Sequence, residues 1–268
     1  MPEGHTIHRL ARDHATWFAG DAVRVCSPQG RFADAARLLD GTVLTGTDAV
    51  GKHLFHRFDS GAVVHVHLGL FGRFYTHATP PPPPRDTVRY RLVGAQRTVD
   101  LVGATACDLL DDDEVARIVA RLGPDPLRRD ADPERAFAAL QRRSVPIGRA
   151  LLDQAVVAGV GNVYRAELLF VHGIHPELPA RAITAERWKQ LWATLVTWMR
   201  AGVRMRRIVT VDPDEVGVPR SRIRRADATY VYRQATCRRC GSAVRRWDLA
   251  GRWAYACETC QPPPRPGS

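Results

Sequence analysis

Four cysteines near the end of the sequence constrain the fold more than any other feature. They follow the spacing Cys237-x2-Cys240-x16-Cys257-x2-Cys260, in which each close pair can present two thiolates from one tight turn. Four thiolates suit a tetrahedral zinc ion, while a redox disulfide and an iron–sulfur centre are the alternatives. We therefore expect a zinc finger with one structural zinc ion, because a closed site leaves no coordination position for chemistry.

Basic residues are concentrated in the same part of the chain. The sequence has 39 Lys and Arg against 28 Asp and Glu, for a net charge of +11, and residues 201–260 alone hold 13 Arg against 6 acidic residues. Between the cysteine pairs, an alternating pattern predicts a two-stranded ribbon that can present Arg245, Arg246 and Arg252 to phosphates. A basic face of this kind favours a nucleic-acid partner, and the alternative is a solvated surface in an arginine-rich organism.

The chain has 268 residues, of which 45% are hydrophobic, so it can build one large core or two modest ones. Its first part predicts one helix over residues 3–18 followed by alternating strands, and its second part is mainly helical. Glycine and proline at residues 123–126 indicate a linker between the parts. The strands are expected at 54–58, 63–68, 88–93 and 98–102, and the later helices at 114–122, from 133, at 146–157, 163–171 and 185–201.

These patterns predict an α+β chain with five segments. The expected boundaries are an N-terminal β-sandwich domain at 1–116, a linker at 117–134, a helical domain at 135–232, the zinc finger at 233–262 and a disordered tail at 263–268. The proline run at 80–84 is expected in an exposed loop, and the isolated Cys26 and Cys107 as small buried apolar residues. No segment has the ~20 apolar residues of a membrane span, so we expect a cytoplasmic monomer without a membrane partner.

The second residue can act as an amine. Removal of Met1, normal before a small residue, would expose the secondary amine of Pro2, which can form an iminium with a carbonyl-like carbon. The pKa of an α-amino group is about 8 in model peptides, and the positive end of a helix over residues 3–18 would further disfavour its protonated form. Glu3 can serve as general acid or base. The alternative is that both are ordinary residues of a first helical turn.

Two further features stand out. The segment from Gly159 to Asn162 lies between two predicted helices, where Gly161 permits close backbone approach and Asn162 is expected as a helix N-cap beside an anion site. An ordinary helix–turn–helix corner is the alternative. Lys52 is one of only two lysines among 39 basic residues; it lies in a predicted turn between strands, and the alternative to a special role is chance.

These features occur together and in one order, and the sequence resembles the Fpg/Nei superfamily of DNA glycosylases over nearly its whole length. The motifs that carry the resemblance are Met1-Pro2-Glu3-Gly4, Leu122-Gly123-Pro124-Asp125-Pro126-Leu127, Val160-Gly161-Asn162-Val163-Tyr164, Gly173-Ile174-His175-Pro176 and the finger that ends in Cys257-x2-Cys260-Gln261. The opening residues are most similar to those of actinobacterial endonuclease VIII-like proteins. The stretch 231–237 is shorter than the family's usual one, and residues 206–228 offer no clear match to its base-capping loop.

The resemblance implies that residues 135–232 form a helix-two-turn-helix DNA-binding domain, whose motif is Val160-Gly161-Asn162-Val163-Tyr164, and it implies a role for each matching residue. Pro2 resembles the nucleophile, Glu3 the acid that protonates the sugar ring oxygen, and Lys52 a phosphate contact that assists catalysis. Asn162, with Gly161 before it, and Arg252 resemble phosphate-binding residues. The family forms a Schiff base, releases the base and cleaves the strand by β,δ-elimination.

The implied partner is double-stranded DNA that contains oxidised bases or abasic sites, bound at the bacterial nucleoid. Because the damaged base must leave the stack, the resemblance also implies a plug, for which we expect Leu70 and, beside it, Phe71; the alternative is that both are buried in a strand. Oxidised pyrimidines are the expected substrates. An 8-oxoguanine or formamidopyrimidine enzyme of the same fold, and a paralogue that binds damaged DNA without catalysis, are the alternatives.

Overall fold

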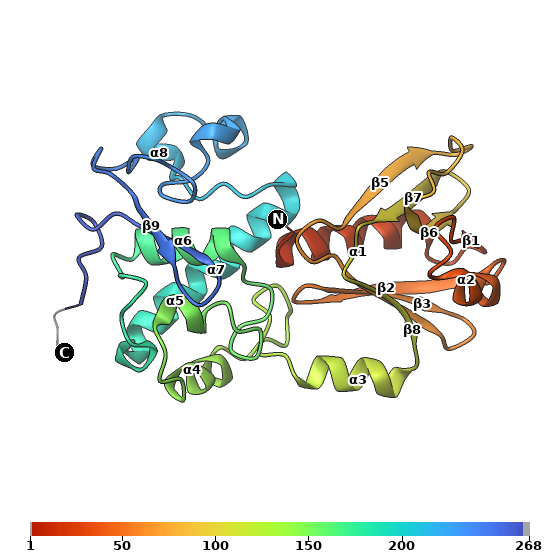
Figure 1. Cartoon of the computed structure of the whole chain (residues 1–268), viewed down its shortest axis with the longest axis horizontal. Coiled ribbons are helices and arrows are strands. Elements are labelled where there is room, and N and C mark those ends of the chain that lie inside the picture. Colours follow the sequence, from red (N-terminus) through yellow and green to blue (C-terminus); the bar gives the residue numbers. More distant parts are fainter. Residues whose placement is uncertain (1, 265–268) are drawn as a thin grey trace. The chain divides into compact units, whose positions relative to one another are not determined.

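A computed structural model describes residues 2–264 and shows two compact units that divide between Arg121 and Leu122 (Figure 1). Residues 265–268 of the predicted disordered tail lie outside the described part. No helix within residues 2–264 is both long and apolar enough to cross a bilayer.

Unit 1 is a β-sandwich preceded by one long helix, α1 (Gly4–Phe18). Its two sheets are antiparallel and have the strand orders β2-β3-β4-β8 and β1-β6-β7-β5. The short helices α2 (Ala33–Leu39) and α3 (Asp112–Ala120) complete the unit. The strands are β1 (Arg24–Cys26), β2 (Leu44–Val50), β3 (His53–Phe58), β4 (Val63–His67), β5 (Arg73–Ala78), β6 (Val88–Val93), β7 (Arg97–Val102) and β8 (Ala106–Leu110).

The core of unit 1 follows from the alternation in its strands. One face of each sheet supplies apolar side chains such as Leu54, Val64 and Leu101, all buried, and this burial is the main favourable term in forming the sandwich. The predicted strands are confirmed, each to within a residue or two. Cys107 is buried as expected, but the prediction for Cys26 is wrong: it is exposed, because β1 is an edge strand of which only the central residue turns inward.

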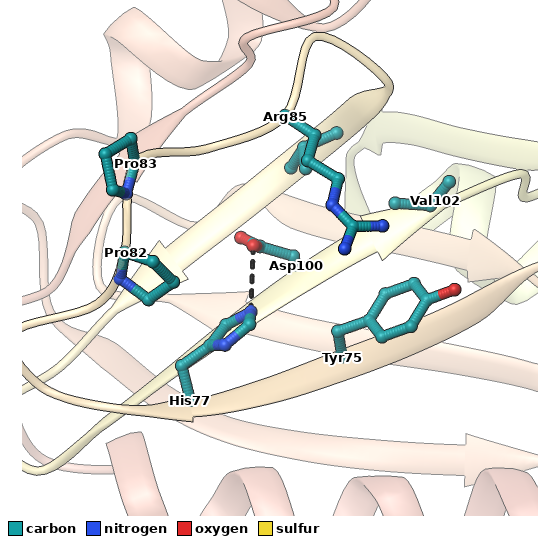
Figure 2. A pocket seen from close by; sticks show the side chains of 8 residues that line it. Tyr75, His77, Pro82, Pro83, Arg85, Asp100 and Val102 are labelled. Atoms are coloured by element: carbon teal, nitrogen blue, oxygen red, sulfur yellow. Dashed lines mark hydrogen bonds and ion pairs between the residues drawn. The ribbon is translucent and has the colours of Figure 1, made fainter.

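The outer face of the second sheet carries a buried ion pair. The guanidinium of Arg91 donates hydrogen bonds to both carboxylate oxygens of Asp100, at 2.6 and 2.7 Å, and the ring of His77 lies 3.1 Å from the same carboxylate. A hollow of about 190 Å³ opens beside His77 and Asp100, walled by Pro82 and Pro83 (Figure 2). The proline run is therefore a surface loop, as predicted.

Unit 2 is helical and carries the cysteine ribbon. Its helices are α4 (Pro133–Gln141), α5 (Ile147–Ala150), α6 (Asn162–Val171), α7 (Ala185–Met205) and α8 (Pro213–Val216), and its strands are β9 (Arg245–Asp248) and β10 (Trp253–Ala256). The antiparallel ribbon is confirmed. Helix α7 runs four residues past its predicted end at 201, and its apolar stripe of Trp188, Leu191 and Leu195 is buried in the core.

One predicted helix is mostly absent. The sequence predicts a helix over residues 146–157, but α5 ends at Ala150. The Asp153 carboxylate accepts a hydrogen bond from the backbone N–H of Ala155 at 2.9 Å and ion-pairs with Arg143 at 2.7 Å. Such local side-chain bonds compete with helix formation, while the apolar residues that follow are buried in turns. The buried residues of these turns recur at a spacing similar to that of a helix, which explains why the sequence predicted one.

Candidate functional site

The predicted functional residues of unit 1 gather at one end of its sandwich. Helix α1 runs antiparallel to β2, because the backbone N–H of Gly20 bonds the carbonyl of Leu44 at 2.8 Å and the hydroxyl of Thr47 bonds the carbonyl of Ala11 at 2.5 Å. The start of α1 therefore lies at the same end of the unit as the turn that follows β2 (Figure 1).

The start of α1 positions Pro2 and Glu3. Glu3 is the N-cap of the helix, with extended backbone, and its side chain is wholly buried. Pro2 directly precedes it and is half-buried. The first N–H groups of a helix carry a partial positive charge, so an amine at Pro2 would lie where the uncharged form is favoured. The predicted helix over residues 3–18 is confirmed.

Lys52 lies in a two-residue hairpin turn between β2 and β3. Val50 and His53 are the last paired residues, and Gly51 has a φ of 60°, the left-handed conformation that such tight hairpins require. The predicted turn is confirmed, and it holds a half-buried Lys52 at the end of the unit where α1 begins.

Three histidines pack beside this turn. The Nδ1 atom of His53 lies 2.9 Å from Nε2 of His65, and the rings of His53 and His67 are 5.0 Å apart. Burial, followed by the charges of His65, His67 and Lys52, lowers the pKa of His53 to about 3. At neutral pH the lysine is therefore bordered by an uncharged imidazole at His53, whose burial already excludes much of the surrounding water.

Leu70 and Phe71 occupy the turn after β4. The last residue of β4, His67, pairs with His53, the first residue after the Lys52 turn, so the two turns lie at the same end of the unit. The relative exposures of Leu70 and Phe71 are 43% and 82%, so the alternative interpretation of buried strand residues is wrong; burial falls on Leu68 instead. A Cβ atom at Gly72 would lie 2.3 Å from the carbonyl oxygen of Leu68, so only glycine allows this tight turn. The turn thus presents two apolar side chains to solvent.

In unit 2, Asn162 is placed differently from the prediction. The N-cap of α6 is Gly161, and Asn162 is the first helical residue. Its amide Nδ2 donates to the carbonyl oxygen of Trp253 at 3.0 Å, so the side chain ties the helix to β10 of the ribbon and does not cap its own helix. The N-cap prediction is therefore wrong, although the residue lies at the helix start as expected.

The same bond brings Asn162 close to Arg252. Arg252 lies directly before Trp253, in the exposed turn of the ribbon, and the indole of Trp253 is itself 49% exposed. The hydrogen bond thus joins the segments that carry these two residues, within one unit. The Asn162 side chain is buried, with its amide engaged by Trp253 and Arg165, whereas Arg252 is exposed.

Sequence reasoning missed the charged residues that hold this arrangement. Arg165 is 1% exposed; its guanidinium donates to the carbonyl of Trp253 at 2.6 Å, to the carbonyl of Gly148 at 3.1 Å and to Oδ1 of Asn162. Arg165 and the residue at 167 are charged positions in an otherwise apolar helix. A helix that is apolar on all sides is buried, and buried charged side chains need partners, so this pattern was the signal that could have predicted these contacts.

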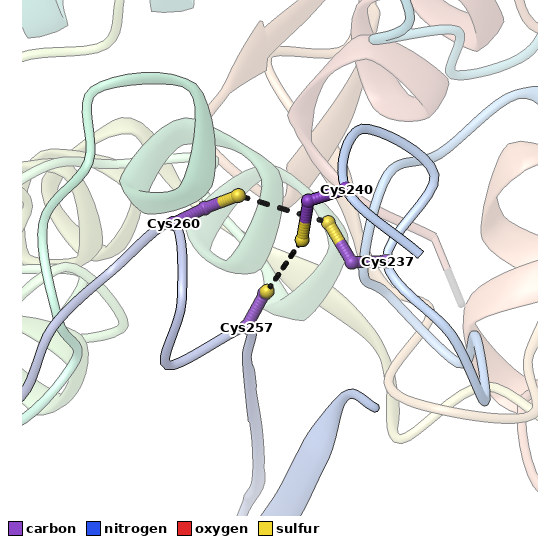
Figure 3. A group of neighbouring side chains, drawn as sticks. All are labelled: Cys237, Cys240, Cys257 and Cys260. Carbon is purple, nitrogen blue, oxygen red and sulfur yellow. Dashed lines mark hydrogen bonds between the residues drawn. The ribbon is translucent and has the colours of Figure 1, made fainter. Parts of the chain in front are cut away.

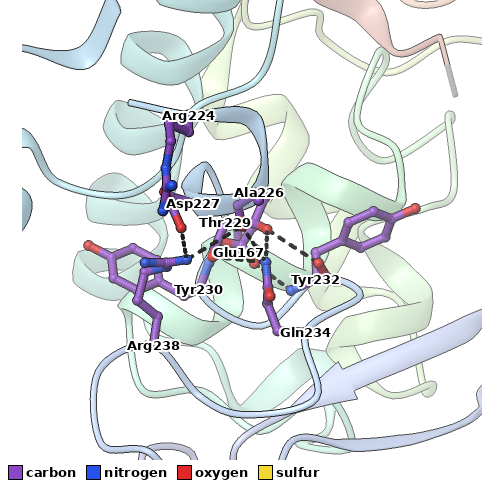
Figure 4. A network of polar contacts seen from close by, with 9 residues as sticks. All are labelled: Glu167, Arg224, Ala226, Asp227, Thr229, Tyr230, Tyr232, Gln234 and Arg238. Carbon is purple, nitrogen blue, oxygen red and sulfur yellow. Dashed lines mark hydrogen bonds and ion pairs between the residues drawn. The ribbon is translucent and has the colours of Figure 1, made fainter. Parts of the chain in front are cut away.

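Glu167 is the second missed residue. Its carboxylate is fully buried and accepts hydrogen bonds from the backbone N–H groups of Tyr230 and Tyr232 at 2.6 and 2.8 Å (Figure 4). It also accepts hydrogen bonds from the backbone N–H of Val231 at 2.9 Å and from the hydroxyl of Thr210 at 2.6 Å. Burial raises the pKa of Glu167, and these hydrogen bonds oppose the rise. The carboxylate thus anchors the chain that leads into the finger.

The four cysteines converge as the spacing predicts. The sulfurs of Cys237 and Cys260 are 4.0 Å apart and those of Cys240 and Cys257 3.4 Å, with all four ligand atoms within 4.8 Å of one another (Figure 3). A tetrahedron with zinc–sulfur bonds of about 2.3 Å has sulfur separations of about 3.8 Å. The donor set and its dimensions therefore fit a four-thiolate metal site.

A β-sandwich, a helical unit and a four-cysteine ribbon are together the architecture of a DNA glycosylase of DNA repair. Comparison with known proteins gives the same class. The family model described as formamidopyrimidine-DNA glycosylase N-terminal domain matches residues 1–104, and the formamidopyrimidine-DNA glycosylase H2TH domain matches residues 122–213. The chain belongs to the family of formamidopyrimidine-DNA glycosylase and endonuclease 8, as its motifs predicted.

Relatives from both branches of the family cover the full chain. Endonuclease 8 1 of Mycobacterium tuberculosis is 51% identical over 268 residues, which cover 97% of this chain and 100% of the relative. Formamidopyrimidine-DNA glycosylase of Mycolicibacterium smegmatis is 31% identical, covering 99% and 98%. The Lactococcus lactis Fpg in complex with DNA containing N7-benzyl-Fapy-dG has a TM-score of 0.79 at 20% identity, covering 98% of this chain and 100% of that one, which supports the fold.

Proposed function

We propose that this chain is a bifunctional DNA glycosylase and abasic-site lyase that uses the amine of Pro2 as its nucleophile. The observation that carries the proposal is the start of α1. A wholly buried Glu3 caps the helix, so Pro2 is held at the positive helix end, where a neutral amine is favoured. A protein that only bound DNA would have no use for this arrangement.

The reaction proceeds in balanced steps from these residues. The neutral Pro2 nitrogen donates its electron pair to C1′ of the damaged nucleotide, and the bond from C1′ to the base breaks with its electron pair leaving on the base. The base takes up the proton that the Pro2 nitrogen loses. Glu3 then gives a proton to the ring oxygen as the bond between that oxygen and C1′ breaks, and the electron pair of the Pro2 nitrogen forms the iminium. Loss of a C2′ proton then expels the 3′ phosphate, and a second elimination expels the 5′ phosphate.

The remaining predicted residues bind and shape the substrate. Lys52, beside the uncharged His53, meets a phosphate next to the damaged nucleotide, and Asn162 and Arg252 meet the backbone from unit 2. Leu70, with Phe71 beside it, fills the gap that the extruded base leaves. The four cysteines would hold zinc, which stabilises the finger and takes no part in the chemistry.

Oxidised pyrimidines are the proposed substrates, with the enzyme acting as a monomer on nucleoid DNA. The support is the identity of 51% to an endonuclease 8 against 31% to a formamidopyrimidine-DNA glycosylase. Release rates measured on matched duplexes test this preference: oxidised pyrimidine is expected to leave faster than 8-oxoguanine, and the reverse order would assign the chain to the other branch.

Borohydride trapping tests the function itself. Reduction of the iminium converts it into a stable amine, so the protein is expected to form a covalent adduct with a duplex that contains an abasic site. Pro2→Gly should greatly slow adduct formation and base release while DNA binding persists. A wild-type protein that binds the duplex but yields no adduct would instead support a non-catalytic damaged-DNA-binding protein.

A further inference from the structure

A second set of charges on the finger is not used by the proposed reaction. Nη1 of Arg245, on β9, donates to Oε1 of Glu258 at 2.7 Å, and its guanidinium lies 4.8 Å from the ring centre of Trp247. The side chains of Arg245 and Glu258 are 51% and 43% exposed. Arg245, which the sequence predicted to contact phosphates, is therefore paired with a carboxylate that lies between Cys257 and Cys260.

A buried histidine stands beside this pair. The His175 side chain is 1% exposed, its ring stacks on Trp247 at 5.5 Å, and its Nε2 lies 4.0 Å from the same Oε1 of Glu258. Its Nδ1 accepts a hydrogen bond from the backbone N–H of Glu177 at 3.2 Å. Since burial lowers the pKa of His175, the ring is neutral at pH 7 and its one proton must be on Nε2.

That Nε2–H group is buried and lacks a hydrogen-bond partner among residues 2–264. A buried donor without a partner is costly, and the hydrogen bond to Arg245 holds the Glu258 carboxylate away from this donor. A movement of Glu258 by about 1 Å would bring its oxygen from 4.0 Å into hydrogen-bond range of Nε2. Glu258 therefore has two alternative partners of opposite kinds, one exposed cation and one buried neutral donor.

We propose that Arg245 is a DNA-backbone ligand held in reserve by Glu258, and that His175 accepts Glu258 as its partner when Arg245 binds a phosphate. Without DNA, Glu258 neutralises Arg245 and keeps it folded over Trp247. On the duplex, the phosphate replaces the carboxylate, and Glu258 moves to the His175 Nε2–H. The inference rests on the proposed binding of DNA, but not on the chemistry at Pro2.

Salt-dependent binding measures the first half of this exchange. The probe is a labelled duplex that contains a tetrahydrofuran abasic analogue, titrated by fluorescence anisotropy over a series of salt concentrations. Each phosphate contact adds about one to the slope of log affinity against log salt, so Arg245→Ala should lower that slope by about one. Arg37→Ala is the control, since Arg37 ion-pairs with Asp34 on α2, in unit 1 at the end away from the start of α1.

A double-mutant cycle measures the second half. Glu258→Gln removes the competing charge and should raise affinity about two- to fivefold with the slope kept. His175→Phe keeps the stack on Trp247 but removes the donor, so it should weaken binding severalfold in the wild-type background and have little effect beside Glu258→Gln. Zinc content and Tm, measured for every variant, show that the finger remains folded.

Two outcomes would overturn the exchange. The first is an unchanged salt slope in Arg245→Ala, and the second is an equal loss of affinity from His175→Phe in both backgrounds. Both are separable from failure of the proposed function, because a wild-type protein that does not bind the abasic duplex at all would contradict that function directly.

Discussion

The two units hold their functional residues in place by different physics. In unit 1, α1 and the Lys52 turn are supported by an apolar sandwich, beside which three uncharged side chains, His14, His56 and Tyr90, form a buried chain with contacts of 3.0 and 3.2 Å. In unit 2, Asn162 and the finger are supported by buried charges on α6 and by four cysteines.

This difference predicts which changes of conditions or sequence will disorder each unit. Apolar packing is insensitive to salt and to metals, and the buried histidines beside it make it sensitive to acid. Buried charges and thiolates lose their role when a single partner is removed. Unit 1 should therefore remain ordered under treatments that disorder unit 2.

Metal removal should have the largest effect. Metal binding to structural four-ligand fingers is worth roughly 10 kcal/mol or more, so a chelator, or Cys257→Ser, is expected to unfold the finger and abolish binding of an abasic duplex. Hydrogen exchange followed by mass spectrometry should show fast exchange over residues 237–260 and unchanged protection in unit 1. Cys26→Ser, at an exposed cysteine, serves as the control, and loss of protection in unit 1 would contradict the comparison.

Removal of the buried carboxylate should come next. Glu167→Ala leaves three backbone N–H groups without their acceptor, while the Thr210 hydroxyl keeps only the carbonyl of Ala228 at 3.1 Å, so we expect a loss of about 3–5 kcal/mol in the free energy of unfolding of unit 2. Urea denaturation measures it. Glu186→Gln, at an exposed position in the first turn of α7, should cost less than about 1 kcal/mol. Equal costs for the two variants would mean that the network is not an anchor.

Acid should weaken unit 1 through its histidines. Burial lowers the pKa of His56 to about 3, against 6.5 in the unfolded chain, so the unfolded state binds the extra proton between these values. The contribution of the neutral His56 ring to the free energy of unfolding is fully present above pH 6.5. It is lost as pH falls toward about 3, by up to about 1.4 kcal/mol per pH unit. Urea unfolding between pH 7 and 4 should show at least this slope, because burial also lowers the pKa of His5 and of His53 to about 3. His56→Gln should reduce the slope by up to about 1.4 kcal/mol per pH unit. A slope unchanged by the substitution would exclude His56.

The smallest expected effect concerns the bond that aligns α1 with β2. Thr47→Val removes the hydroxyl that bonds the Ala11 carbonyl and should cost about 1 kcal/mol of unfolding free energy, with a modest fall in the rate of base release because Pro2 and Glu3 are then less firmly placed. Thr76→Val, at an exposed position on β5, should change neither quantity. A Thr47→Val enzyme of normal stability and rate would show that this bond does not position the helix.

The sequence predicted the parts of this molecule whose signals are local. The helix over residues 3–18, four of the eight strands of unit 1, the Lys52 turn and the converging cysteines all follow from periodicity or spacing. Contacts between distant segments could not be predicted, because the bond from Asn162 to Trp253 and the Glu167 anchor depend on which surfaces meet. The prediction of a helix over residues 146–157 was wrong because burial in turns can imitate helical periodicity, and that for Cys26 because the usual burial of isolated cysteines does not hold at the end of an edge strand.

The most direct test of the account is the identity of the atom that joins the DNA. After borohydride reduction on an abasic duplex, the protein is digested and the modified peptide is sequenced by mass spectrometry. The account predicts that the sugar remnant is attached to the nitrogen of Pro2 in a peptide that lacks Met1. A remnant on the amine of Lys52, or a fully active enzyme that retains Met1, would contradict it.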